Sequence, residues 1–240
     1  MPTPLDVQQA LGLEGAPVAL AFLPEPPPGV ARWDGGPVAA GCAFWRHARD
    51  GRTFYTVPAD HHNCAVGSHV HGIALPDDRA SELEETLGLM ASAGYVDPAE
   101  VPGIPTVSEP PGVVAYGPAA TAPFAPSVVV VAATPAGAML LHEAALRAGA
   151  TPMTAPVSGR PGCAVLPLAM REGQVALSLG CAGNRMTTEL GDHELYVAVP
   201  GPAWPAVVEA LGAVLEANEI MNRAYRERAV GVALVSPGSG

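Results

Sequence analysis

Four cysteines, Cys42, Cys64, Cys163 and Cys181, are the residues of this chain best suited to chemistry. Thiolates are soft nucleophiles that bind iron–sulfur clusters, zinc or copper when several of them converge. The spacing is C-x21-C in the first half and C-x17-C in the second, without the C-x2-C pair of a zinc ribbon or the compact run of a ferredoxin. Spacing alone therefore supports a metal site weakly, and a buried, inert thiol is the alternative for each cysteine.

Histidines are concentrated around Cys64. Four of the seven lie within 11 residues: His61, His62, His69 and His71. Imidazole binds metals and transfers protons near neutral pH. His62, two residues before Cys64, is therefore the first candidate for a base that activates a Cys64 nucleophile, with His61 second. A polar surface loop is the alternative interpretation.

The segment around the last cysteine consists of Gly180-Cys181-Ala182-Gly183-Asn184-Arg185. A guanidinium group suits a carboxylate or phosphate, which makes Asn184 and Arg185 candidates for cofactor binding and Arg185 a candidate catalytic residue. A helix-capping turn with a solvated arginine is the alternative. The sequence contains no Walker loop, dinucleotide-binding glycine fingerprint or Gly-x-Ser-x-Gly elbow, which argues against nucleotide and serine hydrolases.

The composition is typical of a folded, soluble protein. The 240 residues are 49% hydrophobic and 15% charged, which supports a substantial core. A formal net charge of -11 disfavours nucleic acids and anionic membranes as partners. The most apolar run, 128–141, has 14 residues, fewer than the ~20 that span a bilayer. Because the N-terminus lacks a secretory pattern, we expect a cytoplasmic protein whose thiols stay reduced.

Hydrophobic patterning predicts an α+β fold. Thr134 and Pro135 are a typical N-cap and first residue of a helix. A helix at 79–93 carries an apolar stripe and is expected to cover a sheet. The Pro- and Gly-rich segment 96–126 is expected to connect two halves and to hold a short strand at 112–116. The other predicted strands are at 17–22, 53–57, 127–131, 175–179 and 195–200, and the other helices are at 5–13, 38–49, 134–148 and through 207–221.

Similar short motifs recur in the same order in the two halves. Each half has a Cys-Ala pair, a charged turn, a strand and a second Cys-Ala pair: Cys42-Ala43, Arg49-Asp50-Gly51 and Cys64-Ala65 in the first, Cys163-Ala164, Arg171-Glu172-Gly173 and Cys181-Ala182 in the second. Two later matches are Ile73–Pro76 with Val197–Pro200 and Glu85–Gly88 with Glu209–Gly212. Several matches in one order predict internal duplication, and convergent use of the same strand–helix pattern is the alternative.

We therefore predict two related sheet-plus-helix halves in a pseudo-twofold arrangement, 1–110 and 111–230, followed by a flexible tail at 231–240. Residues 16–91 should superpose on 125–215, with Cys42 over Cys163 and Cys64 over Cys181. Because equivalent loops meet near a pseudo-twofold axis, the four thiols are expected to converge between the halves.

The motifs that carry the cysteines resemble a known family, the domain-of-unknown-function 169 group, also called ArCR-like. The resemblance extends from about Pro17 to Leu215 and implies no settled activity. This chain departs from the family pattern in the extra histidines His61, His69 and His71, which leaves open a metal or acid–base function of its own. The matching segments are Gly41-Cys42-Ala43, Ala48-Arg49-Asp50-Gly51, Phe54-Tyr55, His62–Gly67, Cys181-Ala182-Gly183-Asn184-Arg185 and Glu194-Leu195-Tyr196.

Three functions are consistent with these residues. The first is a metal centre on the four cysteines, an iron–sulfur cluster ahead of zinc, with a redox or Lewis-acid role on a small molecule, as in an oxidoreductase or lyase. The second is a metal-free thiol enzyme that uses Cys64 and His62. The third is a non-catalytic module that binds a small molecule or cofactor between the halves, with Arg185 on an anion. A homo-oligomer is left open.

Overall fold

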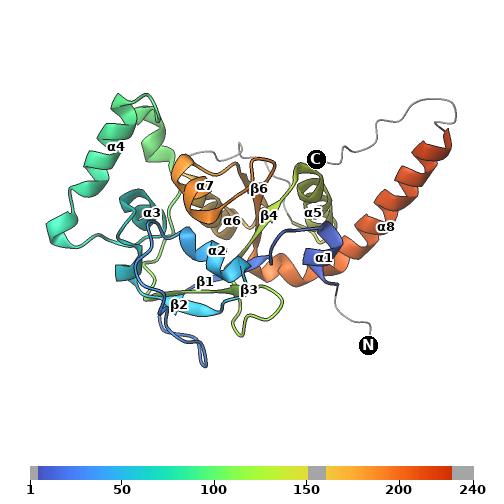
Figure 1. The fold of residues 1–240 in the computed structure, drawn as a ribbon, viewed down its shortest axis with the longest axis horizontal. Coiled ribbons are helices and arrows are strands. Elements are labelled where there is room, and N and C mark those ends of the chain that lie inside the picture. The colour runs from blue at the N-terminus through green and yellow to red at the C-terminus, as the bar shows by residue number, and fades with distance from the viewer. Residues whose placement is uncertain (1–4, 151–160, 229–240) are drawn as a thin grey trace.

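The computed structural model describes residues 5–150 and 161–228, so the tail predicted at 231–240 lies outside the described residues. Within these ranges the chain combines helices with one antiparallel sheet, which confirms the α+β class (Figure 1). No helix in the described ranges is long and apolar enough to cross a membrane. The strands are β1 (Val18–Leu23), β2 (Phe54–Thr56), β3 (Val113–Pro118), β4 (Val128–Ala133), β5 (Ala176–Ser178) and β6 (Leu195–Pro200). The α-helices are α1 (Val7–Leu11), α2 (Ala43–Arg49), α3 (Ala65–Val70), α4 (Glu82–Ser92), α5 (Pro135–Arg147), α6 (Val165–Glu172), α7 (Ala182–Thr188) and α8 (Trp204–Arg228), and the 3-10 helices are η1 (Pro58–His61), η2 (Asp77–Arg79), η3 (Pro98–Gly103), η4 (Gly162–Ala164) and η5 (Gly201–Ala203).

The sheet has six strands in the order β2-β3-β1-β4-β6-β5. All of its strand pairs are antiparallel. The central pair, β1 with β4, is joined through residues 18–20 and 128–130. The two outermost strands, β2 and β5, have three residues each. The central pair therefore divides the sheet into two triplets of strands.

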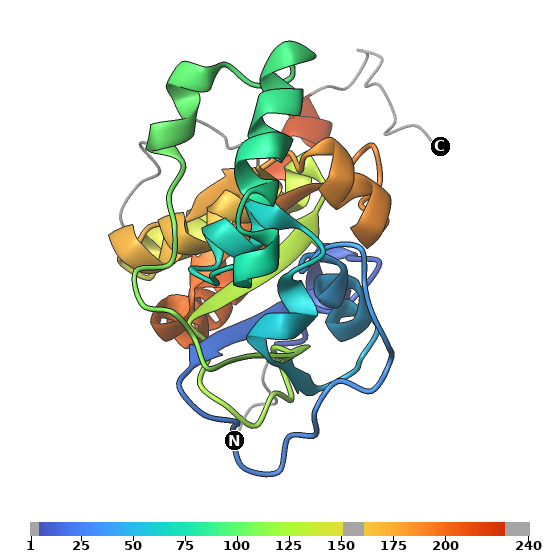
Figure 2. The ribbon, with the colours of Figure 1, turned by 90° about the vertical axis from the view of Figure 1, so that its left-hand side faces the viewer.

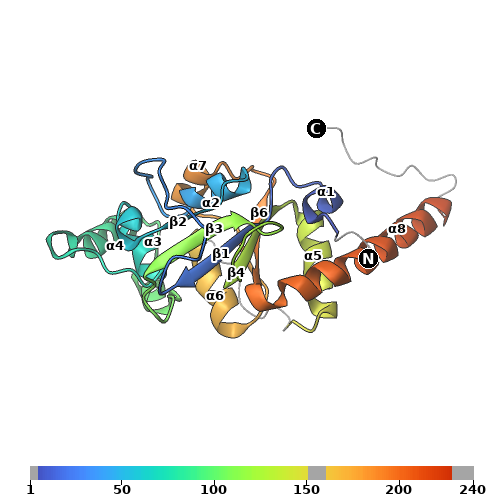
Figure 3. The same ribbon diagram turned by 90° about the horizontal axis from the view of Figure 1, so that it is seen from below.

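Alternate residues of the central strands face two different cores. On β4, Val128 and Val130 belong to one core, whereas Val129 and Val131 belong to the other. Helices α2 and α6 pack over the first core, and α1, α5 and α8 pack over the second. Figure 3 shows α2 and α7 together on one side of the strands, and Figure 1 shows α5 beside α8. Cys42 and Cys163 belong to the first core and Cys64 packs against it, which positions the candidate site on this face.

Local sequence explains where the best-predicted helix begins. The side chain of Thr134 accepts a hydrogen bond from the N–H of Gly137 at 3.2 Å, and Pro135 is the first helical residue of α5. A threonine cap satisfies one of the free N–H groups of the first turn, and proline loses nothing there because its missing N–H would be unpaired. The predicted start of this helix is confirmed.

Helix α2 begins at Ala43, five residues later than the predicted start near Val38. The carbonyl of Val38 accepts a hydrogen bond from the side chain of Asn63 at 2.7 Å, so it is engaged with a distant loop. A turn, with the N–H of Ala43 on the carbonyl of Ala40, leads into the helix. Cys42 consequently stands at the N-cap of α2 and not inside the helix.

Helix α4 does not cover the sheet, contrary to the sequence-based expectation. None of its residues is buried, and it packs against α3. Figure 2 shows α4 and the segment that follows it standing above the layered body of the protein. The apolar stripe of the helix is used locally, because Leu87 and Met90 line a cavity next to α3. We call residues 82–104, which include α4 and η3, the arm.

The segment predicted to connect the halves contains a central strand. β3 lies between β2 and β1 and pairs with both. By contrast, Ile73–Pro76, which the motif comparison matched with Val197–Pro200, is irregular, whereas the second segment lies in β6. That match was therefore wrong at the level of structure. In each triplet a long strand lies between the central strand and the edge strand. This strand is β6 in the second triplet and β3, not Ile73–Pro76, in the first.

Candidate functional site

Each cysteine lies at the beginning of a helix. Cys42 is the N-cap of α2, Cys64 of α3 and Cys181 of α7. Cys163 lies in the short helix η4, which leads directly into α6. All four thiols are free. The chain thus places each thiol where a loop from the sheet turns into a helix.

The four cysteines line one cavity of about 200 Å³. Electrostatic coupling supports their proximity, since Cys42 is influenced by Cys64 and Cys181, Cys64 by Cys181, and Cys163 by all three others. The expected convergence of the thiols is therefore found in the structure. The other residues that line the cavity are Ala40, Gly41, Val66, Gly67, His71, Leu87, Met90, Tyr95, Val96, Ile104, Pro161, Ala182, Gly183 and Asn184.

Burial keeps the thiols of Cys42, Cys64 and Cys163 protonated in the metal-free protein. Cys42 and Cys163 are each 8% exposed, and Cys64 is partly buried. Burial raises the pKa of Cys42 to about 11, raises the pKa of Cys64, and raises that of Cys163 well above the usual value. The neighbouring thiols shift these pKa values in the same direction, because a second thiolate repels the first.

Three of the sulfur atoms each have one polar neighbour within hydrogen-bond distance. The Sγ of Cys64 accepts from the N–H of Gly67 at 3.3 Å, and the Sγ of Cys181 accepts from the N–H of Asn184 at 3.4 Å. Both contacts are N-cap bonds to the third residue of the helix. The Sγ of Cys42 lies 3.4 Å from the hydroxyl of Thr187. The two bonds donated by backbone N–H groups favour a charged sulfur.

Two buried polar side chains in the cavity lack hydrogen-bond partners among the described residues. His71 is 1% exposed and both of its ring nitrogens are unpaired there. Asn184, also 1% exposed, has neither amide atom in a hydrogen bond of normal geometry, although it lies close enough to Cys42 to lower the pKa of that thiol. Burial lowers the pKa of His71 to about 4, so the ring is neutral at pH 7.

The other histidines near Cys64 do not line the cavity. His61 is buried in an aromatic cluster with Phe44 and Tyr116, and its Nε2 lies 2.8 Å from the hydroxyl of Thr56. That hydroxyl also donates to the carbonyl of Val114, so it accepts from His61. His62 is partly buried outside the cavity, and His69 is exposed on α3. The structure thus brings His71, and not the favoured His62, to the thiols.

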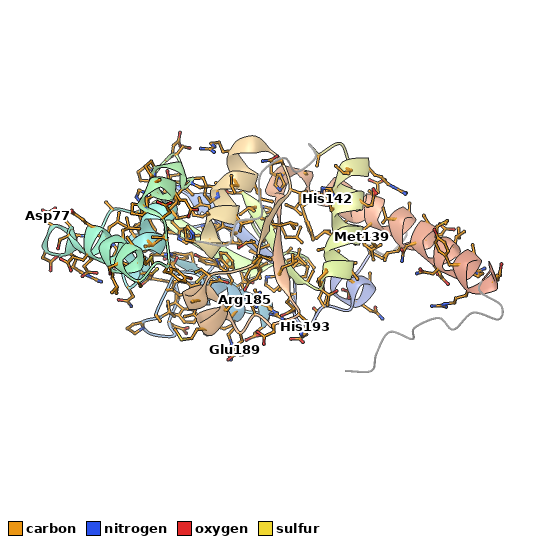
Figure 4. The ribbon with its side chains drawn as sticks, turned by 90° about the horizontal axis from the view of Figure 1, so that it is seen from above. Asp77, Met139, His142, Arg185, Glu189 and His193 are labelled. Carbon is orange, nitrogen blue, oxygen red and sulfur yellow. The ribbon has the colours of Figure 1, made fainter. Side chains whose placement is uncertain are left out.

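Arg185 is bonded to the backbone. Its guanidinium donates to the carbonyls of Leu179, Gly191 and Glu194 at 2.8 to 3.0 Å. In Figure 4 it lies on the same side of the molecule as Glu189 and His193. Asn184, the preceding residue, lines the cavity with the thiols. The anion-binding role predicted for Arg185 stays a prediction, while its observed contacts fix the turn between β5 and β6.

The sequence did carry a signal for His71. It lies seven residues after Cys64, which is two turns of a helix, so the two side chains share one face of α3. No comparable signal identified the cavity residues of the arm, such as Leu87, Tyr95 and Ile104. The apolar stripe of α4 predicted cover for the sheet, whereas its residues Leu87 and Met90 are only partly buried and line the cavity.

The residue before Cys42 is a glycine because the site has no room for a side chain. A Cβ atom on Gly41 would lie 2.5 Å from the Nδ1 of His61. His61 is 1% exposed and bonded to Thr56, so it cannot move without breaking that contact. We expect Gly41→Ala to lower the free energy of unfolding by about 1–3 kcal/mol, measured by urea denaturation.

The matched control is Gly88→Ala in α4, where nothing lies within 4 Å of the added Cβ. Alanine is the better helix former, so this change should raise stability by up to about 1 kcal/mol. Equal effects of the two substitutions would contradict the close packing inferred at Gly41.

Comparison with known proteins gives a family and no function. The family model described as "Uncharacterised ArCR", domain of unknown function 169, matches residues 6–210. No curated protein and no solved structure is significantly similar to the chain. The match includes all four cysteines and most of the described fold. The chain therefore belongs to the domain-of-unknown-function 169 family of uncharacterised ArCR proteins.

Proposed function

We propose that Cys42, Cys64, Cys163 and Cys181 hold an iron–sulfur cluster and that the protein is a redox protein acting on a small molecule. The observation that carries the proposal is the meeting of four free thiols, two from each part of the chain, in one cavity. Four cysteines are the usual ligand set of such clusters. Because the sulfurs come from four separate helix starts, the spacing in the sequence did not resemble a compact cluster motif.

The described side chains argue against a single metal ion. Four thiolates around one zinc ion lie at about 2.3 Å from it and so about 3.8 Å from one another. Among the described residues, no three cysteine, histidine or carboxylate side chains are placed to hold one metal ion. In a four-iron cluster each thiolate binds a different iron, so the sulfurs stay further apart.

The donor set fits this group chemically. The lining is apolar apart from the thiols, His71, Asn184 and the Tyr95 side chain, and soft sulfur ligands select iron–sulfur clusters over hard cations. The N–H groups of Gly67 and Asn184 are directed at sulfur, where they would stabilise thiolate charge. A cluster with all four positions occupied by thiolates supplies one-electron transfer. It leaves no open iron for a Lewis-acid role, so we favour the redox function.

The thiol-enzyme alternative has less support. A nucleophilic cysteine needs a lowered pKa or an adjacent base, but burial raises the pKa of Cys64. His62 does not line the cavity. The Nε2 of His61 is hydrogen-bonded to the hydroxyl of Thr56 and not to a thiol. The anion-binding alternative is also weakened, because Arg185 is occupied by three carbonyls.

Anaerobic purification followed by iron, sulfide and thiol analysis tests the proposal. We expect brown protein with about four irons and four sulfides per chain and a broad charge-transfer absorption that bleaches on reduction. Colourless protein with four titratable thiols and no metal would overturn the proposal. One zinc per chain without sulfide would replace the cluster by a mononuclear site.

We further propose that the chain arose by internal duplication. The support is the sheet order, which is β2-β3-β1 from one edge and β5-β6-β4 from the other. Each triplet contains a Cys-led helix, a three-residue edge strand and a second Cys-capped helix in the same chain order. This correspondence extends the first unit to the end of β3, beyond the predicted boundary at 110. In an experimental structure, a superposition of the triplets that failed to align Cys42 with Cys163 would contradict it.

We also propose a reducing, cytoplasmic location. Its support is that all four thiols are free although they converge, since an oxidising compartment favours pairing of nearby cysteines. Detection of the tagged protein in a periplasmic or extracellular fraction would count against it.

A further inference from the structure

Among the described residues, no charged side chain lines the cavity that holds the thiols. Its described lining contains no lysine, arginine, aspartate or glutamate. A charged molecule entering it would lose its hydration without gaining a counter-ion, which costs far more than the same step for a neutral molecule. The described lining therefore selects against anions, which the negative charge of four thiolate ligands would also repel.

Two side chains provide hydrogen bonds that the described protein does not use. The imidazole of His71 and the carboxamide of Asn184 are both 1% exposed and unpaired in the described ranges. A buried, unpaired polar group costs about 1–3 kcal/mol, so such groups mark the place of a missing partner. One nitrogen of a neutral imidazole donates and the other accepts, and a carboxamide does both.

The arm forms the outer wall of the cavity. Leu87 and Met90 of α4 line it, and Tyr95 accepts a hydrogen bond from the N–H of Ala182 at 3.0 Å, which joins the arm to the start of α7. None of the residues of α4 is buried. The wall is thus joined to the thiol site through Tyr95, while α4 packs against α3 without a buried residue of its own.

We propose that the space between the thiols and the arm binds a small, uncharged organic molecule with both a hydrogen-bond donor and an acceptor, held by His71 and Asn184. The cavity volume of about 200 Å³ limits it to a few heavy atoms beside the cluster. The inference rests on the proposed function for its redox chemistry, because the molecule is the substrate that the cluster serves. Its binding is measurable without that chemistry.

Isobutyramide and isobutyrate are suitable probes because they have the same shape, one neutral and one charged at pH 7. We expect the anaerobically prepared protein to bind isobutyramide saturably in a saturation-transfer NMR titration, and isobutyrate at least tenfold more weakly. His71→Leu and Asn184→Leu should each weaken isobutyramide binding tenfold or more, as one lost hydrogen bond of about 1.4 kcal/mol requires.

His69→Leu is the matched control, since His69 is exposed on the same helix as His71 and should leave binding unchanged. Met90→Trp fills the cavity from the arm and should abolish binding even if a buried variant fails to fold. Equal binding of the two probes, unchanged binding in both leucine variants, or no saturable binding of isobutyramide would each overturn the inference.

Iron and sulfide measured on the same sample separate the two proposals. Binding that depends on His71 in protein without a cluster would leave this inference standing while the cluster proposal fails. Protein with a full cluster and no isobutyramide binding would overturn this inference alone.

Discussion

The Cys163→Ala protein, purified anaerobically, is expected to retain less than about a tenth of the wild-type iron and sulfide, because removal of a ligand costs more than the 10–100-fold typical of an outer-shell change. Cys163 is 8% exposed and lines the cavity with the other three cysteines. The same loss is expected for Cys42→Ala, Cys64→Ala and Cys181→Ala. Iron and acid-labile sulfide are measured per folded monomer after gel filtration.

Thr187→Val is the matched control for this series. Its hydroxyl lies 3.4 Å from the Sγ of Cys42 and contacts no other thiol in the described structure. The variant should keep its iron and sulfide, because Thr187 is not a ligand and its hydroxyl donates to the carbonyls of Gly183 and Asn184 and not to sulfur. A cysteine variant that keeps full iron and sulfide would show that its thiol is not a ligand.

The sequence predicted the meeting of the thiols through its repeated motifs and not through their spacing. The two Cys-Ala pairs in each half mark helix starts, and in the structure these helix starts meet at one cavity. Cys64 and Cys181 even share the same N-cap bond to the third helical residue. Periodicity also identified the buried strand of β4, whose residues are all buried.

Long-range contacts account for what the sequence could not predict. The stripe on α4 is equally consistent with packing on a sheet or on α3, because periodicity identifies a buried face and not its partner. β3 follows a Pro- and Gly-rich segment, yet it pairs with both β1 and β2, which lie much earlier in the chain. Tyr95 joins the cavity through the backbone of Ala182, 87 residues away.

His71 should make the metal-free protein sensitive to acid. Burial lowers its pKa to about 4 in the folded state, from the usual value of 6.5 that we assign to the unfolded chain. The unfolded state therefore takes up a proton first as the pH falls. Stability is complete above pH 6.5 and decreases as the pH falls from 6.5 towards 4, by about 3 kcal/mol for this group. Burial also lowers the pKa of His61 well below its usual value, so His61 adds a second contribution of the same sign.

His71→Leu should remove that part of the acid sensitivity which belongs to this ring. Urea denaturation of the metal-free wild type and variant at pH 7 and pH 4 gives the decrease in unfolding free energy of each protein between the two pH values. Carboxyl groups that titrate near pH 4 contribute equally to both proteins, so they cancel when the two decreases are subtracted. We expect the wild type to lose about 3 kcal/mol more than His71→Leu between these pH values. His69→Leu should follow the wild type, because that side chain is exposed in both states. Identical losses in the wild type and His71→Leu would mean that His71 is protonated, or reached by water, in the folded protein, and the neutral imidazole in the thiol cavity would then be wrong.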